Sequence, residues 1–202
     1  MIEKEYKEML DVHLYNQVDE LFPWDSKIKQ TNYYYMDPDK ELLFNNIHVR
    51  VRKKADQYRL QIKFPCTGKE DDESGLHIRN EKEKCIDDLP ALIRSEEIYD
   101  ITHFISKDAM KIGSLVTERK VYRPDESIEI CLDRSYYEDC TDYEIEVEYT
   151  CKEDDEKLLE IKDLLTDAGI TFQNKTKGKF TRFFERYLEI NRGEIHVQDS
   201  VL

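Results

Sequence analysis

The feature that most constrains the fold is a two-residue alternation of apolar and charged side chains that recurs along most of the chain. In residues 47–52 (IHVRVR), the odd positions are apolar and the even positions carry His48, Arg50 and Arg52. Successive side chains of a β-strand point to opposite faces of the sheet, so this pattern predicts a strand with one apolar and one charged face. Strands of this kind are predicted over residues 3–7, 47–52, 58–64, 76–83, 115–123, 127–133, 143–149 and 180–187.

Other segments predict the rest of the secondary structure. Residues 31–36 (TNYYYM) are aromatic and typical of a strand, and an Asp-Pro-Asp turn follows them. Apolar residues at helical spacing predict helices over residues 9–22 and 153–168, and one or two helices over residues 89–110. Gly169 stands where a helix C-cap belongs, and the acidic stretch between Gly68 and Gly75 is typical of a hairpin loop.

The charged faces are sorted by sign. Basic residues stand at positions 50, 52, 59 and 63, and acidic residues at 129, 133, 144, 146 and 148. One interpretation is an open antiparallel sheet whose charged face lies in water. We favour a closed barrel, for which about eight strands suffice, with apolar faces outside under helices and charged faces lining a lumen. Because unpaired charges are costly to bury, such a lumen indicates a site for a polyanion with a divalent metal.

Composition narrows the classes of partner and location. The formal net charge of −14 argues against a nucleic acid polymer or an acidic membrane surface as partner. No apolar run is long enough for a membrane span, and the N-terminus has no signal-peptide pattern. The five cysteines contain no C-x-x-C pair, which favours reduced thiols in a cytoplasmic protein. The sequence is compatible with a homodimer and does not indicate an oligomeric state.

Several motifs resemble one family in their order along the chain. Glu3-Lys4-Glu5-Tyr6-Lys7 matches the E-x-E-x-K signature that opens the CYTH domain, or triphosphate tunnel metalloenzyme, family. Arg50-Val51-Arg52, a strand ending in Lys63, and Glu144-Ile145-Glu146 follow in the family's order. The chain most resembles the bacterial, Firmicutes-type members, which are related to thiamine triphosphatase and class IV adenylate cyclase. The resemblance implies an α+β fold with an eight-stranded antiparallel β-barrel over residues 1–190 and a C-terminal tail over residues 191–202.

The resemblance also implies a set of site residues. The expected ligands of Mg²⁺ or Mn²⁺ are Glu3, Glu5, Asp133, Glu144 and Glu146. The expected contacts to a triphosphate are Lys7, Arg50, Arg52, Lys63, Arg79, Arg119, Lys175, Lys177 and Arg182, among which Lys7, Arg52 and Lys63 are assigned to catalysis.

Three positions carry further expectations. Glu118 stands where a lysine often precedes the family's arginine, so Lys120 or Arg123 is left to supply that phosphate contact. Glu148 shares the phase of Glu144 and Glu146 but lies near its strand end, so we expect it at the rim or on the surface. His77-Ile78 replaces a Leu-Glu step that is common in bacterial relatives.

The predicted function is a metal-dependent phosphohydrolase, a triphosphatase that acts on the phosphoanhydride bonds of a small molecule. The substrates that the resemblance implies are inorganic triphosphate, thiamine triphosphate and nucleoside triphosphates. Two alternatives remain open at this point: an adenylate cyclase that makes cyclic AMP from ATP, and a non-catalytic sensor that binds polyphosphate or a nucleotide.

Overall fold

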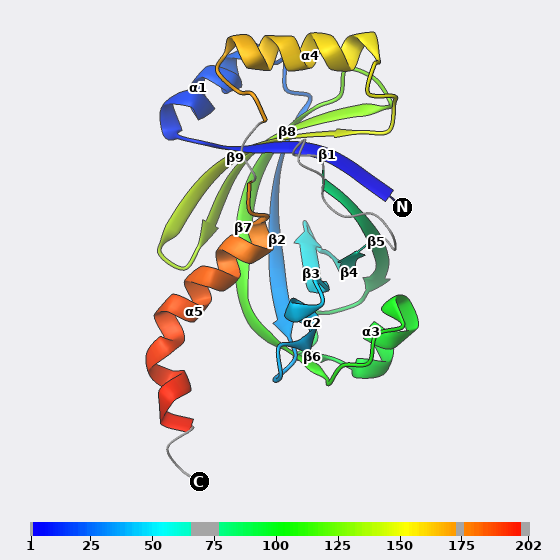
Figure 1. The fold of residues 1–202 in the computed structure, drawn as a ribbon, viewed down its shortest axis with the longest axis vertical. Coiled ribbons are helices and arrows are strands. Elements are labelled where there is room, and N and C mark those ends of the chain that lie inside the picture. Colours follow the sequence, from blue (N-terminus) through cyan, green and yellow to red (C-terminus); the bar gives the residue numbers. More distant parts are fainter. Residues whose placement is uncertain (1, 66–76, 173–175, 199–202) are drawn as a thin grey trace.

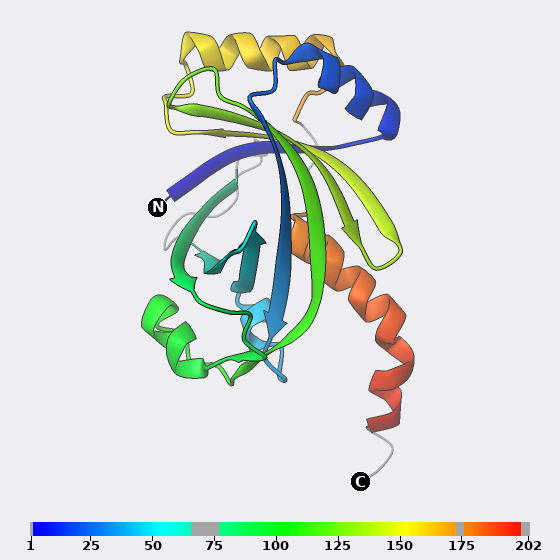
Figure 2. The same ribbon diagram turned by 180° about the vertical axis from the view of Figure 1, so that it is seen from behind.

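A ring of antiparallel strands forms the body of the protein (Figures 1 and 2). The computed structural model describes residues 2–65, 77–172 and 176–198; the side chains of residues 2, 3, 77–79 and 192–198 lie outside the description. The strands are β1 (Ile2–Leu10), β2 (Ser26–Met36), β3 (His48–Lys54), β4 (Gln57–Pro65), β5 (His77–Ile86), β6 (Leu92–Ile93), β7 (Ala109–Tyr122), β8 (Ile128–Tyr137) and β9 (Cys140–Tyr149). The helices are α1 (Val12–Leu21), α2 (Glu41–Phe44), α3 (Ser95–Thr102), α4 (Glu156–Asp167) and α5 (Lys179–Gln198).

The strand order explains how the ring is made. The strands pair in the order β2-β3-β4-β5-β1-β9-β8-β7-β6, and β2 also pairs with β7 from Ser26 to Met36. Eight strands therefore form a ring, in which β7 pairs with β2. The two-residue β6 lies outside this ring and pairs with the start of β7. The predicted α+β fold of antiparallel strands with helices outside is confirmed.

The apolar faces of the strands turn outward and are covered by helices. Ile145 and Val147 of β9 pack in one core with Leu158 and Leu165 of α4 and Val18 of α1. Figure 1 shows α1 and α4 lying together over this side of the ring. A second core joins the apolar residues of β3 and β4 to Ile98 of α3. Covering the apolar faces in this way leaves the charged faces for the interior.

The segment of residues 180–187 is helical, so the strand predicted there is wrong. It forms the first turns of α5, and Figure 1 shows the rest of this helix leading away from the body. Phe180, Phe183, Phe184 and Tyr187 recur at spacings of three and four, which places them on one helical face. Together with Tyr34 and other ring residues they form the third core. The apolar spacing, rather than the two arginines between these residues, determined the structure.

The other helix boundaries differ from the predictions in detail. The predicted helix 9–22 begins later, because β1 continues to Leu10 and the Asp11 carboxylate caps α1 by accepting from the Leu14 N–H at 2.8 Å. Residues 89–110 hold α3, the short β6 and the start of β7. Gly169 follows α4 with φ of +95°, as a C-cap glycine does. The loop predicted between Gly68 and Gly75 lies outside the described residues.

None of the helices in the described parts of the chain is both long and apolar enough to cross a lipid bilayer.

Candidate functional site, a tunnel with an acidic and a basic wall

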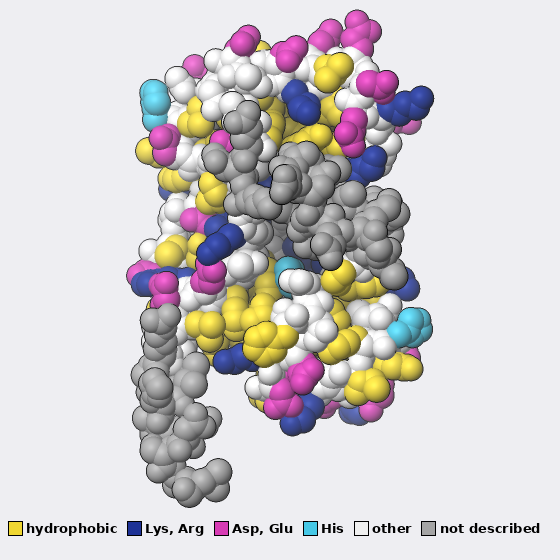
Figure 3. All heavy atoms as spheres, viewed as in Figure 1, with side chains coloured by type: hydrophobic (Ala, Val, Ile, Leu, Met, Phe, Trp, Pro, Cys, Tyr) yellow, Lys and Arg dark blue, Asp and Glu magenta, His cyan; other side chains and the backbone are white. Residues whose placement is uncertain are grey.

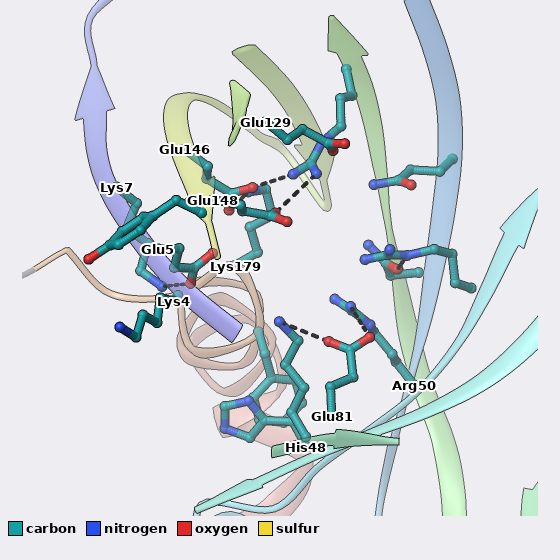
Figure 4. A pocket seen from close by; sticks show the side chains of 18 of the residues that line it. Lys4, Glu5, Lys7, His48, Arg50, Glu81, Glu129, Glu146, Glu148 and Lys179 are labelled. Atoms are coloured by element: carbon teal, nitrogen blue, oxygen red, sulfur yellow. Dashed lines mark hydrogen bonds and ion pairs between the residues drawn. The ribbon is translucent and has the colours of Figure 1, made fainter. Parts of the chain in front are cut away.

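The charged faces of the strands enclose a cavity of about 730 Å³. Its lining comes from every strand of the ring and from the start of α5, and it includes residues far apart in sequence, such as Glu5, Arg50, Glu146 and Lys179 (Figure 4). The alternation along each strand therefore becomes one continuous interior surface. Carboxylates gather on the side of β1, β8 and β9, and basic side chains on the side of β3 and β4.

Three carboxylates form a compact group on the acidic wall. Glu5 of β1 pairs in register with Glu148 of β9, and Lys7 pairs with Glu146, so these side chains share the interior face. One oxygen each from Glu5, Glu146 and Glu148 lies within 4.8 Å of the other two. A cluster of carboxylate oxygens is the donor set that hard divalent cations such as Mg²⁺ and Mn²⁺ prefer, so these residues fit such an ion.

Neighbouring cations keep two members of this group, Glu5 and Glu146, ionised. Burial raises the pKa of Glu5, but the Lys7 ammonium, 2.7 Å from its carboxylate, and Lys63 together leave the pKa below its ordinary value. Burial likewise raises the pKa of Glu146, and Lys179 and Arg119 together hold it well below the ordinary value. Both carboxylates are therefore available as anionic ligands near neutral pH.

Deeper in the acidic wall, carboxylates are matched by cations of the chain itself. The Lys179 Nζ lies 2.9 Å from Asp133, 2.8 Å from Glu144 and 2.6 Å from Glu146. Arg119 donates two hydrogen bonds to Asp133, at 2.8 and 2.7 Å, and also contacts Glu146. Burial raises the pKa of Glu144 to about 6 despite its contact with Lys179. The same burial disfavours the charged form of Lys179, but the surrounding carboxylates hold its pKa well above the ordinary value.

The basic wall carries three cations that are held by polar neighbours. The Nε of Arg50 donates to Gln61 at 2.9 Å, and the Nε of Arg52 donates to Asn32 at 3.1 Å. The Lys63 Nζ lies 3.1 Å from Glu81. Burial and the nearby Arg50 and Arg119 lower the pKa of Arg52 to about 10. A region that crowds cations so closely favours an anion, because an anion relieves their mutual repulsion.

Two polar groups that β2 contributes to the cavity lining lack a hydrogen-bond partner among the described residues. They are the hydroxyl of Tyr34 and the Nδ2 of Asn32, and both residues are about 1% exposed. A buried polar group without a partner is costly, so such groups usually meet water or a ligand. Their position beside Arg50 and Arg52 supports a polar occupant of the cavity.

The structure gathers most of the residues predicted from the sequence. Those that line the cavity are Glu5, Lys7, Arg50, Arg52, Lys63, Arg119, Glu146 and Lys177. Asp133, Glu144 and Arg182 are absent from the described lining and lie in the wall behind it, where Arg182 contacts Glu144 and, at 2.7 Å, Asp142. The side chains of Glu3 and Arg79, and all of Lys175, lie outside the described residues.

Other residues of the site did not emerge from the sequence patterns. Glu148, expected at the rim or on the surface, lines the cavity within the carboxylate group, and Lys179 directly precedes the segment 180–187 that was interpreted as a strand. Of the two residues left open beside Glu118, Arg123 lines the cavity and pairs with Glu129, whereas Lys120 contacts Asp19 of α1. The sequence held one indication for Glu148, because it alternates in phase with Glu146 along the strand. For Lys179 the only indication was its position one residue before the aromatic residues of α5.

Fold and site together define a class: a ring of antiparallel strands around a cavity with one acidic and one basic wall. The chain belongs to the CYTH domain family, whose model matches residues 1–184. A candidate triphosphatase of Bacillus subtilis (strain 168), YjbK, is 28% identical over 190 residues, which cover 91% of this chain and 95% of that protein.

Two solved structures share the fold. A candidate adenylate cyclase from Bacillus halodurans matches with a TM-score of 0.66 and 22% identity, covering 89% of this chain and 96% of its own. HpAC1 from Hippeastrum, a candidate adenylyl cyclase described as having a dominant triphosphatase activity, matches with a TM-score of 0.70 and 22% identity. That match covers 91% of this chain and 95% of HpAC1.

Proposed function

We propose that this protein is a metal-dependent triphosphatase that hydrolyses the terminal triphosphate of a small molecule. The observation that carries the proposal is the placement of a three-carboxylate group and a wall of arginine and lysine across one cavity. A triphosphate carries several negative charges and can meet cations on one side and a carboxylate-held metal on the other. The candidate triphosphatase from Bacillus subtilis, similar along nearly its whole length, supports the same activity.

The ligands of Mg²⁺ or Mn²⁺ in this proposal are Glu5, Glu146 and Glu148, with Glu3 as a further candidate from the sequence motif. A bound divalent ion would neutralise phosphoryl charge and make water a better nucleophile near neutral pH. Lys7 stays beside Glu5 and would reach phosphate oxygens that approach the same ion. The acidic wall then binds a metal and its substrate together rather than an anion alone.

The basic wall orients the substrate. Arg50 and Arg52 hold phosphate oxygens through planar guanidinium groups, and Lys63 acts as a point charge at the next strand. Gln61, Asn32 and Glu81 fix these cations before the substrate arrives, which reduces the ordering that binding would otherwise require. Stabilising the charge of the phosphoryl group as it is transferred supplies most of the acceleration in this class of reaction.

The test is phosphate release from inorganic triphosphate, thiamine triphosphate and ATP, each with EDTA, Mg²⁺ or Mn²⁺. We expect release that depends on metal and is fastest with one of the three substrates. No release from any of them, under conditions where the protein binds the metal and the triphosphate, would contradict the proposal.

Product analysis with ATP separates the alternatives predicted from the sequence. A triphosphatase yields ADP and phosphate, whereas a cyclase yields cyclic AMP and pyrophosphate, and a sensor yields neither. We expect a small-molecule substrate rather than a nucleic acid polymer, because the net charge of −14 repels a long polyanion outside the tunnel.

A further inference from the structure

Lys179 occupies the position of a cation within the acidic wall. Its Nζ lies within 2.9 Å of an oxygen of each of three carboxylates, those of Asp133, Glu144 and Glu146. Its side chain is only 10% exposed, and Asp133 is fully buried. Three oxygens around one buried positive centre resemble the surroundings of a bound metal ion, with an ammonium in its place.

Every carboxylate around this position already lies beside a cation of the chain. Arg119 contacts Asp133 and Glu146, and Arg182 contacts Glu144 and Asp142, in addition to the contacts of Lys179. Buried carboxylates are stable only when paired in this way. Glu148 lies nearer the open part of the cavity: it is 3.6 Å from Arg119, and its side chain is 29% exposed, compared with 9% for Glu146 and none for Asp133.

Packing holds Lys179 in place. It is the first residue of α5, and Phe180, Phe183 and Phe184 directly after it are buried in the third core. Figure 4 shows Lys179 and Glu148 close to Glu146, and Glu5 on the neighbouring strand β1. Glu146 therefore belongs to two cation positions. The Lys179 ammonium occupies the first, and the second lies between Glu146, Glu5 and Glu148.

We propose that the Lys179 ammonium occupies the cation position between Asp133, Glu144 and Glu146, where a metal ion would otherwise bind. A single divalent ion then binds at the other position, formed by Glu5, Glu146 and Glu148. Asp133 and Glu144, expected from the sequence as metal ligands, then serve to position Lys179 and Arg119. The proposal rests on the proposed function only in assuming that the tunnel binds a divalent metal. Every test below measures metal binding without substrate, so a lack of triphosphatase activity would not affect it.

The first test compares two neutral substitutions on β9 by calorimetric titration with Mn²⁺. Glu148→Gln removes a proposed ligand and should weaken Mn²⁺ binding at least about 50-fold, since even the partners of metal ligands cost 10- to 100-fold when lost. Glu144→Gln should weaken it no more than about fivefold, because its charge is already matched by Lys179 and Arg182. Equal and large losses in the two variants would overturn the proposal.

The second test removes the Lys179 ammonium. Lys179→Met should bind two Mn²⁺ ions per chain where the wild-type protein binds one, because the second ion replaces the ammonium among Asp133, Glu144 and Glu146. Lys84→Met, which removes a lysine paired with Glu97 on the outer surface, should keep the wild-type stoichiometry. A single ion in folded Lys179→Met would contradict the proposal.

If Lys179→Met is less stable than the wild-type protein, its melting temperature with and without Mn²⁺ still tests the proposal. Unpaired buried carboxylates destabilise a fold, and a second metal ion would restore the balance. We expect Mn²⁺ to raise the melting temperature of Lys179→Met more than that of the wild-type protein. An equal or smaller rise would overturn the proposal, as would Glu144→Gln losing Mn²⁺ as strongly as Glu148→Gln.

Discussion

At the scale of single residues, Glu81 shows how a carboxylate of the chain neutralises basic side chains of the cavity before a ligand binds. Its carboxylate lies 3.1 Å from the Lys63 Nζ and 3.7 Å from Arg50, and it accepts from Gln61 at 2.8 Å. Burial raises its pKa, but Arg50 and Lys63 outweigh this and lower the pKa to about 2. Glu81 thus holds the basic wall together as an internal anion.

This arrangement predicts a pH-dependent contribution to stability. The folded-state pKa of Glu81 is below its unfolded value of 4.5, so its contribution is complete above that value and is lost as the pH falls toward about 2. Glu81→Gln should lower the free energy of unfolding at pH 7 by roughly 3 kcal/mol, from 1.36 kcal/mol per pKa unit. Urea unfolding at pH 7 and pH 3 measures the difference, which should shrink at pH 3.

The matched control is Glu97→Gln on α3, which removes a partly exposed carboxylate paired with the exposed Lys84. Exposed ion pairs contribute little, so its effect should be below about 1 kcal/mol at both pH values. A difference between wild type and Glu81→Gln that stays the same at pH 7 and pH 3 would contradict this assignment.

At the scale of elements, the sequence predicted where the strands lie in the chain better than it predicted the register in which they pair. Alternation within one segment identifies a charged face, so the strand around Arg50 and Arg52 was predicted almost to its ends. It carries no information on which residues of two strands lie opposite, and the pairing of Glu5 with Glu148 therefore emerged only from the fold. The segment after residue 179 failed for a different reason: two arginines four residues apart share a face in a helix and in a strand alike.

The packing of α5 on the ring predicts an unusual requirement for glycine. A Cβ at Gly113 of β7 would lie 2.6 Å from the Cζ of Phe183, and the Phe183 ring is fully buried. Gly113→Ala should therefore destabilise the fold by about 1–3 kcal/mol, the usual cost of overpacking. Urea unfolding of the single variant measures this loss.

A double-mutant cycle identifies the cause. Phe183→Leu shortens the side chain that the new methyl group meets, so Gly113→Ala should cost much less in that background than in the wild-type protein. Strictly additive effects would show that the loss arises from the strand backbone rather than from this contact.

At the scale of the whole molecule, one acidic and one basic wall face each other across the same cavity in a protein of net charge −14. Folding brings oxygens of Glu5, Glu146 and Glu148 within 4.8 Å of one another, so a divalent ion held by them would bind the folded chain in preference to the unfolded one. Metal binding and the stability of the ring are therefore linked.

The linkage predicts stabilisation by Mg²⁺ or Mn²⁺. An ion at 100 times its dissociation constant should add about 2.7 kcal/mol to the free energy of unfolding. Glu5→Gln should lose most of this gain, whereas Glu160→Gln, an exposed carboxylate of α4, should keep it. Melting curves in EDTA and in excess metal measure the gain, and an equal gain in both variants would place the ion elsewhere.

The most direct test of the account is the rate of Mn²⁺-dependent phosphate release from inorganic triphosphate by wild type, Glu146→Gln and the control Glu160→Gln. Glu146 belongs to the carboxylate group and also contacts Lys179 and Arg119, so its loss disturbs the acidic wall at its centre. We expect release by wild type and Glu160→Gln, and a rate lower by about 100-fold or more in Glu146→Gln, comparable to losing one group that stabilises transition-state charge. Release by Glu146→Gln at the wild-type rate would contradict the account.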